Sequence, residues 1–208
     1  MKRIWLVRHG ESKAQTMEQY SFDADLSKFG EEQAQALQEA LSAKNINFSQ
    51  AYVSPLRRAR QTFEFINSDE KISNNPQTEC FFDVRLIEEM PKESYQTLLP
   101  YELLPDYAKL INNDAWLLHM NENIADFCDT LLMKKEITGD ILIVCHMGVL
   151  NYLMRQLQSY CSSPDKIADA IYYFHNCSYS IVEIADDFTC DIVELDNINH
   201  LKEKKLLR

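Results

Sequence analysis

Two histidines stand directly after short apolar runs of the sequence, and each has a glycine close behind it. His9 lies within residues 6–12 (LVRHGES), and His146 lies within residues 143–149 (IVCHMGV). A lone histidine at the end of a strand is usually structural, but a following glycine lets the backbone approach a ligand closely. Arg8 beside His9 adds a charge that a protein core would accept only with an anion. The two histidines therefore predict a site for an anionic ligand.

A third segment, residues 54–62 (SPLRRARQT), carries three arginines at the expected start of a helix. Arg57 and Arg60 are interpreted as parts of a solvated helix face. Arg58 is the candidate anion ligand, because a helix N-terminus together with an arginine suits a phosphate.

A fourth segment, residues 86–89 (LIEE), places two carboxylates side by side in an expected loop. Such a pair is usually just solvated. Near a phosphate, one of them could serve as a general acid if burial or like-charge crowding raises its pKa. Successive side chains of an extended segment point to opposite faces, so only one of the pair can face the site, and the spacing from Leu86 favours Glu88 over Glu89.

The elements that must position these groups alternate between strands and helices. Strands are predicted over residues 4–7, 48–53, 78–82, 141–144, 178–184 and 189–195, the last two joined as a hairpin at residues 186–187. Helices are predicted from a Ser27 cap to about residue 44, from a Ser54 cap with Pro55 in the first turn, around residues 124–132, and over residues 149–157.

This alternation predicts an α/β three-layer sandwich, with helices on both faces of a largely parallel central sheet. Ligands of such sheets bind beyond the carboxyl ends of the strands, where both histidines would lie. We expect residues 1–208 to form one domain with a small helical cap insertion, a cap-like excursion at about residues 90–135. The basic tail over residues 201–208 is expected to be peripheral. His175 and Asn176 could reach the rim of the site, but they are interpreted as a polar turn.

The net charge, the apolar stretches and the cysteines exclude several classes of partner and enzyme. The chain has 208 residues and a net charge of −11, which argues against nucleic acid or an anionic membrane as a partner. No apolar stretch approaches the roughly 20 residues of a membrane helix, and Arg8 interrupts the only run that resembles a signal peptide. The six cysteines form no Cys-x-x-Cys pair, and none has an arginine six positions later as cysteine phosphatases require. They are interpreted as reduced thiols of a cytoplasmic protein.

Taken in order, these segments resemble the histidine phosphatase superfamily, also called the phosphoglycerate mutase-like family. The matching motifs are Arg8-His9-Gly10-Glu11-Ser12, Leu26-Ser27 with Gly30 and Gln33-Ala34, Ser54-Pro55-Leu56 with Arg58-Ala59 and Gln61-Thr62, Leu86-x-Glu88, and Val144-Cys145-His146-Met147-Gly148.

The resemblance implies a role for each matching position. His9 would be the nucleophile that becomes a phosphohistidine, Glu88 would protonate the leaving group, and Arg8, Arg58 and His146 would bind the phosphoryl oxygens. A neutral imidazole is nucleophilic near pH 7, since its ordinary pKa is about 6.5. Two arginines and a protonated His146 would supply the positive charge, so we expect no metal and no other cofactor. Ser12, Gln15 and Met147 are the further substrate-binding candidates.

Three functions stay open at this point. His146 lies only 58 positions after Glu88 (146 − 88), whereas the family's mutases tend to be longer here, so a phosphatase is favoured over a mutase. The Gly-x-Trp-x-Asp stretch common in the mutases is also missing at residues 20–25. A phospho-ligand binding protein without turnover is the third reading. The expected ligand is a small phosphorylated metabolite or a phosphorylated peptide.

Overall fold

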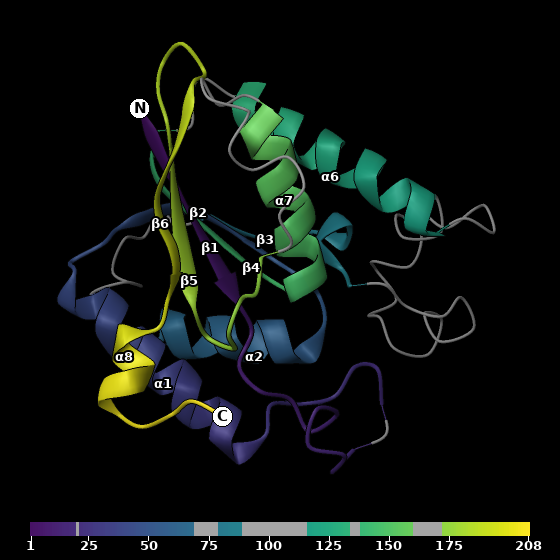
Figure 1. Ribbon diagram of the computed structural model, residues 1–208, viewed down its shortest axis with the longest axis vertical. Coiled ribbons are helices and arrows are strands. Elements are labelled where there is room, and N and C mark those ends of the chain that lie inside the picture. Colours follow the sequence, from purple (N-terminus) through teal and green to yellow (C-terminus); the bar gives the residue numbers. More distant parts are fainter. Residues whose placement is uncertain (20, 69–78, 89–115, 134–137, 160–171) are drawn as a thin grey trace.

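A single sheet runs through the protein, as the computed structural model shows (Figure 1). The structure describes residues 1–19, 21–68, 79–88, 116–133, 138–159 and 172–208. Within these residues the sheet has six strands, in the order β3-β2-β4-β1-β5-β6. They are β1 (Lys2–Arg8), β2 (Phe48–Val53), β3 (Glu79–Phe82), β4 (Gly139–Cys145), β5 (Tyr179–Ile184) and β6 (Cys190–Asn197).

The sheet is mixed. Strands β3, β2, β4 and β1 pair in parallel, whereas β5 and β6 pair antiparallel at one edge. The two central strands, β1 and β4, are apolar over most of their length because both of their faces are covered. The hairpin expected from the last two strands is confirmed, with its turn at residues 185–188.

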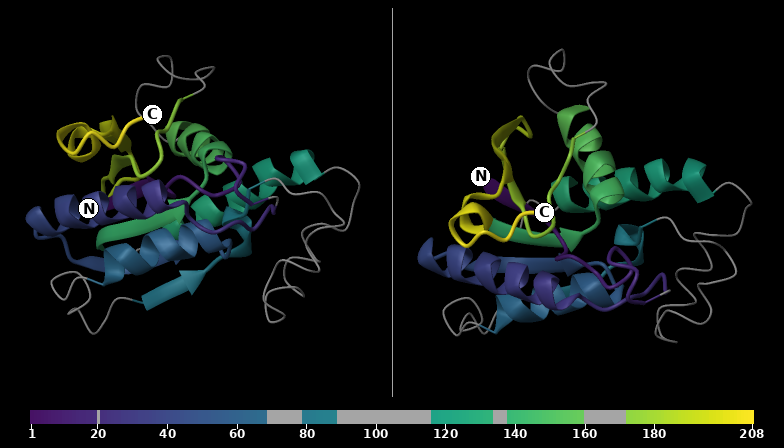
Figure 2. Two further views of the ribbon diagram at one scale, coloured as in Figure 1. Left: turned by 90° about the horizontal axis from the view of Figure 1, so that it is seen from below. Right: turned by 60° about the horizontal axis from the view of Figure 1, so that its bottom comes forward.

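Helices cover both faces of the sheet (Figure 2). On one face lie α6 (Trp116–Met133) and α7 (Met147–Ser159), which share a buried cluster with the 3₁₀ turn η1 (Val84–Leu86). On the other face lie α1 (Lys28–Ala43), α2 (Arg57–Asn67) and α8 (Asn199–Glu203). The predicted three-layer α/β fold is therefore confirmed. None of the helices in the described part of the chain is long and apolar enough to cross a membrane.

Local capping agrees with the sequence at one helix and not at another. Ser27 caps α1 as expected, because its hydroxyl accepts from the Gly30 N–H at 3.0 Å. The expected Ser54 cap is wrong: α2 begins later, at Arg57, and its N-cap residue Leu56 makes no side-chain cap bond. The Ser54 hydroxyl is instead engaged by the ring of His146.

The C-terminal tail, residues 201–208, packs against the fold. The tail is not peripheral, since Leu201 and Leu206 belong to the buried cluster beneath α1 and the Gln33 side chain donates to the Leu206 carbonyl at 3.1 Å. Most of the expected cap at about residues 90–135, namely residues 90–115 and 134–135, lies outside the described residues. Its described part is α6, which packs beside α7 through Ile124 and Phe127.

Candidate active site

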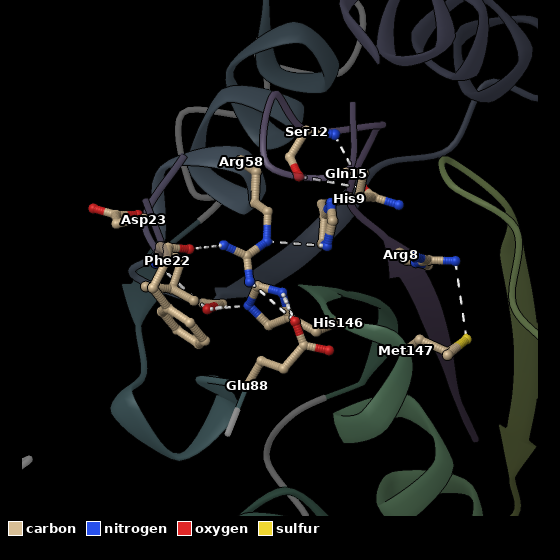
Figure 3. Close-up of polar contacts among 12 residues, drawn as sticks. Arg8, His9, Ser12, Gln15, Phe22, Asp23, Arg58, Glu88, His146 and Met147 are labelled. Atoms are coloured by element: carbon tan, nitrogen blue, oxygen red, sulfur yellow. Dashed lines mark hydrogen bonds and ion pairs between the residues drawn. The ribbon is translucent and has the colours of Figure 1, made fainter. Parts of the chain in front are cut away.

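The carboxyl ends of the parallel strands bring the predicted groups to one rim. Arg8 pairs with Cys145 at the ends of β1 and β4, and Val53 pairs with Val144 where β2 ends. The residues that follow these strand ends therefore lie side by side: His9 after β1, His146 after β4 and Ser54 after β2. The ring centroids of the two histidines lie 5.0 Å apart (Figure 3).

Two glycines let the loop after β1 pack directly on the start of α1. A Cβ atom at Gly10 would lie 2.6 Å from the Gly30 carbonyl oxygen, and one at Gly30 would lie 2.0 Å from the Glu11 carbonyl oxygen. Neither position tolerates a side chain, because both contacts are with backbone. The Gly10 N–H also donates to Thr62 Oγ1 at 3.0 Å, which ties the loop to α2. The loop that carries His9 is thus held from two sides.

The hydrogen bonds of His9 define which nitrogen carries the proton. Arg58 Nε donates to His9 Nε2 at 3.2 Å, so Nε2 must hold the lone pair. His9 Nδ1, 2.7 Å from the Gly10 carbonyl oxygen, then carries the proton and donates it there. Burial lowers the pKa of His9 well below its ordinary value, and Arg58 and Arg8 lower it further. The ring is neutral, with its free electron pair directed at Arg58.

His146 is oriented by a different partner, the Ser54 hydroxyl. Its Nε2 lies 2.8 Å from the Ser54 hydroxyl, while its fully buried Nδ1 has no hydrogen-bond partner among the described residues. A Ser54 hydroxyl that donates to Nε2 leaves the proton on Nδ1. Burial first, and then Arg58, lowers the pKa of His146 well below its ordinary value. This environment favours the neutral ring, so the expected protonated His146 is not supported.

Two guanidinium groups flank the histidines. Arg58 Nη1 donates to the Phe22 carbonyl at 2.6 Å, and its Cζ lies 5.4 Å from the centre of the Phe22 ring. Arg8 Nη1 donates to the Phe174 carbonyl at 2.5 Å and lies 3.9 Å from Met147 Sδ, whereas the buried Arg8 Nε has no partner in the described part of the chain. Because an arginine stays charged even when buried, the site holds two fixed positive charges.

The groups open into one cavity of about 270 Å³. Its lining comprises Arg8, His9, Ser12, Ala14, Gln15, Ser21, Phe22, Arg58 and Glu88. His146 is fully buried beside it, and Met147 is not among the lining residues but contacts Arg8. The structure thus brings seven of the eight predicted site residues to the cavity or its floor. Glu89 lies outside the described residues.

Three contributors to the site were given no site role from the sequence. Phe22 contacts Arg58 through both its carbonyl and its ring, and no sequence motif includes Phe22. Ser54, expected as a helix cap, orients His146 instead. Asn176, interpreted as part of a polar turn, donates to the His9 carbonyl at 2.9 Å. Of the three, only Ser54 belongs to a motif that the sequence shows, Ser54-Pro55-Leu56.

The same residues offer a possible set of metal ligands. One ligand atom each from His9, Glu88 and His146 lie within 4.8 Å of one another. The charges oppose a cation there, however, because Arg58 and Arg8 already disfavour a proton on either ring. The His9 lone pair also faces Arg58 Nε. The donor set fits an anion better than a metal ion.

Comparison with known proteins agrees with this geometry. Residues 4–197 match the model of the histidine phosphatase superfamily (branch 1). The human 6-phosphofructo-2-kinase/fructose-2,6-bisphosphatase 4 is 26% identical over 161 residues, covering 74% of this chain and 32% of that protein. The chain therefore spans about a third of the length of the curated relatives that it matches.

Solved structures share the fold. The alpha-ribazole phosphatase from Shigella flexneri superposes with a TM-score of 0.67 at 23% identity, covering 94% of this chain and 96% of that chain. A phosphoglycerate mutase from Bacillus anthracis also gives a TM-score of 0.67, at 18% identity, with 98% and 96% covered.

Proposed function

This chain belongs to the histidine phosphatase superfamily, and we propose that it is a phosphoric monoester hydrolase that works without a metal, through a phosphohistidine on His9. The observation that carries the proposal is the state of His9. Its Nδ1 proton is bound by the Gly10 carbonyl, and its Nε2 electron pair lies at the floor of a cavity with two guanidinium groups.

In the proposed first step, His9 Nε2 attacks the phosphorus and the bond from phosphorus to the ester oxygen breaks. Glu88, displaced from Arg58 by the substrate and protonated there from solvent, gives its proton to that oxygen, so the leaving group departs as an alcohol. The ring keeps its Nδ1 proton and gains positive charge, which the Gly10 carbonyl stabilises at 2.7 Å. In the second step water attacks the phosphorus, Glu88 takes the proton of the water, and His9 leaves as a neutral ring.

The phosphoryl oxygens would be bound by Arg58, Arg8 Nε and His146 Nδ1. Arg8 Nε and His146 Nδ1 lack any hydrogen-bond partner among the described residues. Arg58 donates to His9, Phe22 and Glu88, and the substrate would displace Glu88 from it. Phosphoryl transfer depends mainly on positioning and on electrostatic stabilisation of these oxygens, so fixed donors can serve in place of a metal ion.

The other predicted residues receive more limited roles. Ser12 and Gln15 line the cavity, and we assign both to substrate binding. Met147 contacts the Arg8 guanidinium, so we assign it to holding that group. The proposed substrate is a small phosphorylated metabolite or a phosphorylated peptide.

We also propose a cytoplasmic location, on the basis of cysteine chemistry. Among the described residues, Cys128, Cys145 and Cys177 are buried cysteines outside any disulfide. Burial raises the pKa of Cys128 to about 12, which makes its thiol unreactive. Buried, unreactive thiols suit a reducing compartment. The net charge of −11 argues against nucleic acid and anionic membranes as partners.

Hydrolysis of p-nitrophenyl phosphate tests the function. We expect release of nitrophenol by the wild type and none above background by His9→Ala. Binding of inorganic phosphate without any turnover would favour the non-catalytic binding protein. Conversion of 3- to 2-phosphoglycerate in the presence of 2,3-bisphosphoglycerate, faster than hydrolysis, would favour the mutase.

A further inference from the structure

The side chains of Gln15 and Asn176 form a reciprocal pair of hydrogen bonds at the mouth of the cavity. Gln15 Nε2 donates to Asn176 Oδ1 at 3.2 Å, and Asn176 Nδ2 donates to Gln15 Oε1 at 3.3 Å. The two residues are 161 positions apart, so this pair joins the loop after β1 to the segment before β5.

Asn176 and Ser12 together determine which end of the Gln15 amide faces the ligand. Gln15 Oε1 accepts from the Ser12 N–H at 3.0 Å and lies 3.3 Å from the Ser12 hydroxyl, in addition to its contact with Asn176. All of these partners are donors, so the oxygen must point toward them. Gln15 lines the cavity, and Nε2 has a second hydrogen beyond the one given to Asn176.

Asn176 is itself held by the backbone of the nucleophile. Its Nδ2 donates to the His9 carbonyl at 2.9 Å. The neighbouring Cys177 N–H donates to the Arg8 carbonyl at 3.0 Å, and the Phe174 carbonyl accepts from the Arg8 guanidinium. A segment fastened at three points to Arg8 and His9 is a firm support for a side chain that reaches Gln15.

We propose that Asn176 is a positioning residue, which holds the Gln15 amide so that Nε2 donates to a phosphoryl oxygen. Without Asn176 only Ser12 holds the amide of the exposed Gln15 side chain, so the amide turns over more often, and its oxygen then faces the anion and repels it. The proposal rests on the proposed function in one respect only, namely that the cavity binds a phosphoryl group.

A double-mutant cycle on equilibrium binding tests this role. The probe is inorganic phosphate, and its Kd is measured by titration calorimetry for the wild type, Gln15→Ala, Asn176→Ala and the double variant. A hydrogen bond to a charged group is strong enough that we expect Gln15→Ala to raise Kd about 10-fold and Asn176→Ala about 5-fold. The double variant should match Gln15→Ala at about 10-fold, because Asn176 acts through Gln15.

Two results would overturn the proposal. One is an additive loss of about 50-fold in the double variant, which would give Asn176 an independent role in binding. The other is an unchanged Kd in either single variant. Asn199→Ala, an exposed asparagine on α8, is the matched control and should bind like the wild type. If far-ultraviolet circular dichroism shows that Asn176→Ala does not fold, Asn176→Ser takes its place in the cycle.

The two proposals fail in different ways. Phosphate binding with a coupled cycle but no hydrolysis would contradict the proposed function and leave the role of Asn176 supported. Hydrolysis together with an additive cycle would support the proposed function and contradict the role of Asn176. A wild type that binds no phosphate would contradict both.

Discussion

Arg58 and Glu88 form an ion pair inside the cavity, with 3.0 Å between Nη2 and Oε2 (Figure 3). The same carboxylate oxygen lies 3.6 Å from His146 Nδ1. The Arg58 side chain is only 6% exposed, and a buried guanidinium needs an anion beside it. Glu88 thus lies on the donors that we assign to the phosphoryl oxygens. In the proposed reaction the phosphoryl group displaces Glu88 from Arg58, and the released carboxyl group must take up a proton before it can act as the acid.

Replacing Glu88 should therefore change binding and turnover in opposite directions. We expect Glu88→Gln to tighten inhibition by inorganic phosphate about 5-fold, because a competing charge is removed. Turnover of alkyl phosphates should fall by roughly 10²–10⁴, the usual contribution of a general acid. Hydrolysis of p-nitrophenyl phosphate should be largely spared, since nitrophenolate leaves without a proton.

Glu89→Gln is the matched control for this experiment. It should alter neither phosphate inhibition nor the dependence on the leaving group. If the selective loss with alkyl phosphates appears in Glu89→Gln instead, the proton donor is Glu89. If neither variant shows it, the proton comes from another group.

The charges of the site lead to a second prediction, on metal dependence. Arg8 and Arg58 supply fixed positive charge, so activity should survive EDTA. Orthovanadate should inhibit, because it adopts the trigonal-bipyramidal geometry of the transferring phosphoryl group. Steady-state rates before and after chelation check this point. Loss of turnover with EDTA, and its recovery with Zn²⁺ or Mg²⁺, would instead assign a metal to His9, Glu88 and His146.

The third prediction separates two arginines of α2. Arg58 is buried and donates to His9, Phe22 and Glu88, whereas Arg60 is partly exposed and lies over the Phe82 ring. We expect Arg58→Lys to lower kcat/KM by a factor of 100 or more, on the order of the loss of one preorganised donor to a developing charge. Arg60→Lys should stay near the wild type. Equal losses in both variants would refute the assignment of Arg58.

The fourth prediction concerns stability and pH. Burial lowers the pKa of His200, whose Nε2 lies 2.9 Å from the Cys177 carbonyl oxygen and whose buried Nδ1 has no partner among the described residues. The pKa of His9 and of His146 is lowered as well. The unfolded chain, with an ordinary histidine pKa of about 6.5, therefore binds protons that the folded state resists. Stability is complete above that value and is lost as the pH falls toward the lower folded pKa values.

Urea unfolding at about pH 7.5 and about pH 5.5 measures this loss as a lower midpoint in acid. His200→Gln, which cannot titrate, should show a smaller decrease between the two pH values than the wild type. A midpoint that rises in acid, or an equal decrease in both proteins, would contradict the assignment.

The sequence and the structure agree where the signal is local. The apolar runs at β1 and β4 and the groups directly after them, His9 and His146, could be located because strand burial and strand ends leave a pattern in adjacent residues. The contacts of Ser54, Asn176 and Leu206 could not, because each joins segments far apart in the chain. The neutral state of His146 also depends on burial and on Arg58, neither of which its own neighbours in sequence reveal.

The central claim is that His9 carries the phosphoryl group, and trapping the intermediate tests it most directly. A phosphorus–nitrogen bond is labile in acid and stable in base, unlike a phosphoserine. We expect rapid quenching in base, with a radiolabelled phosphomonoester, to yield one labelled peptide, the one that contains Arg8-His9-Gly10, and His9→Ala to yield none. A label that resists acid, or that persists in His9→Ala, would contradict the account.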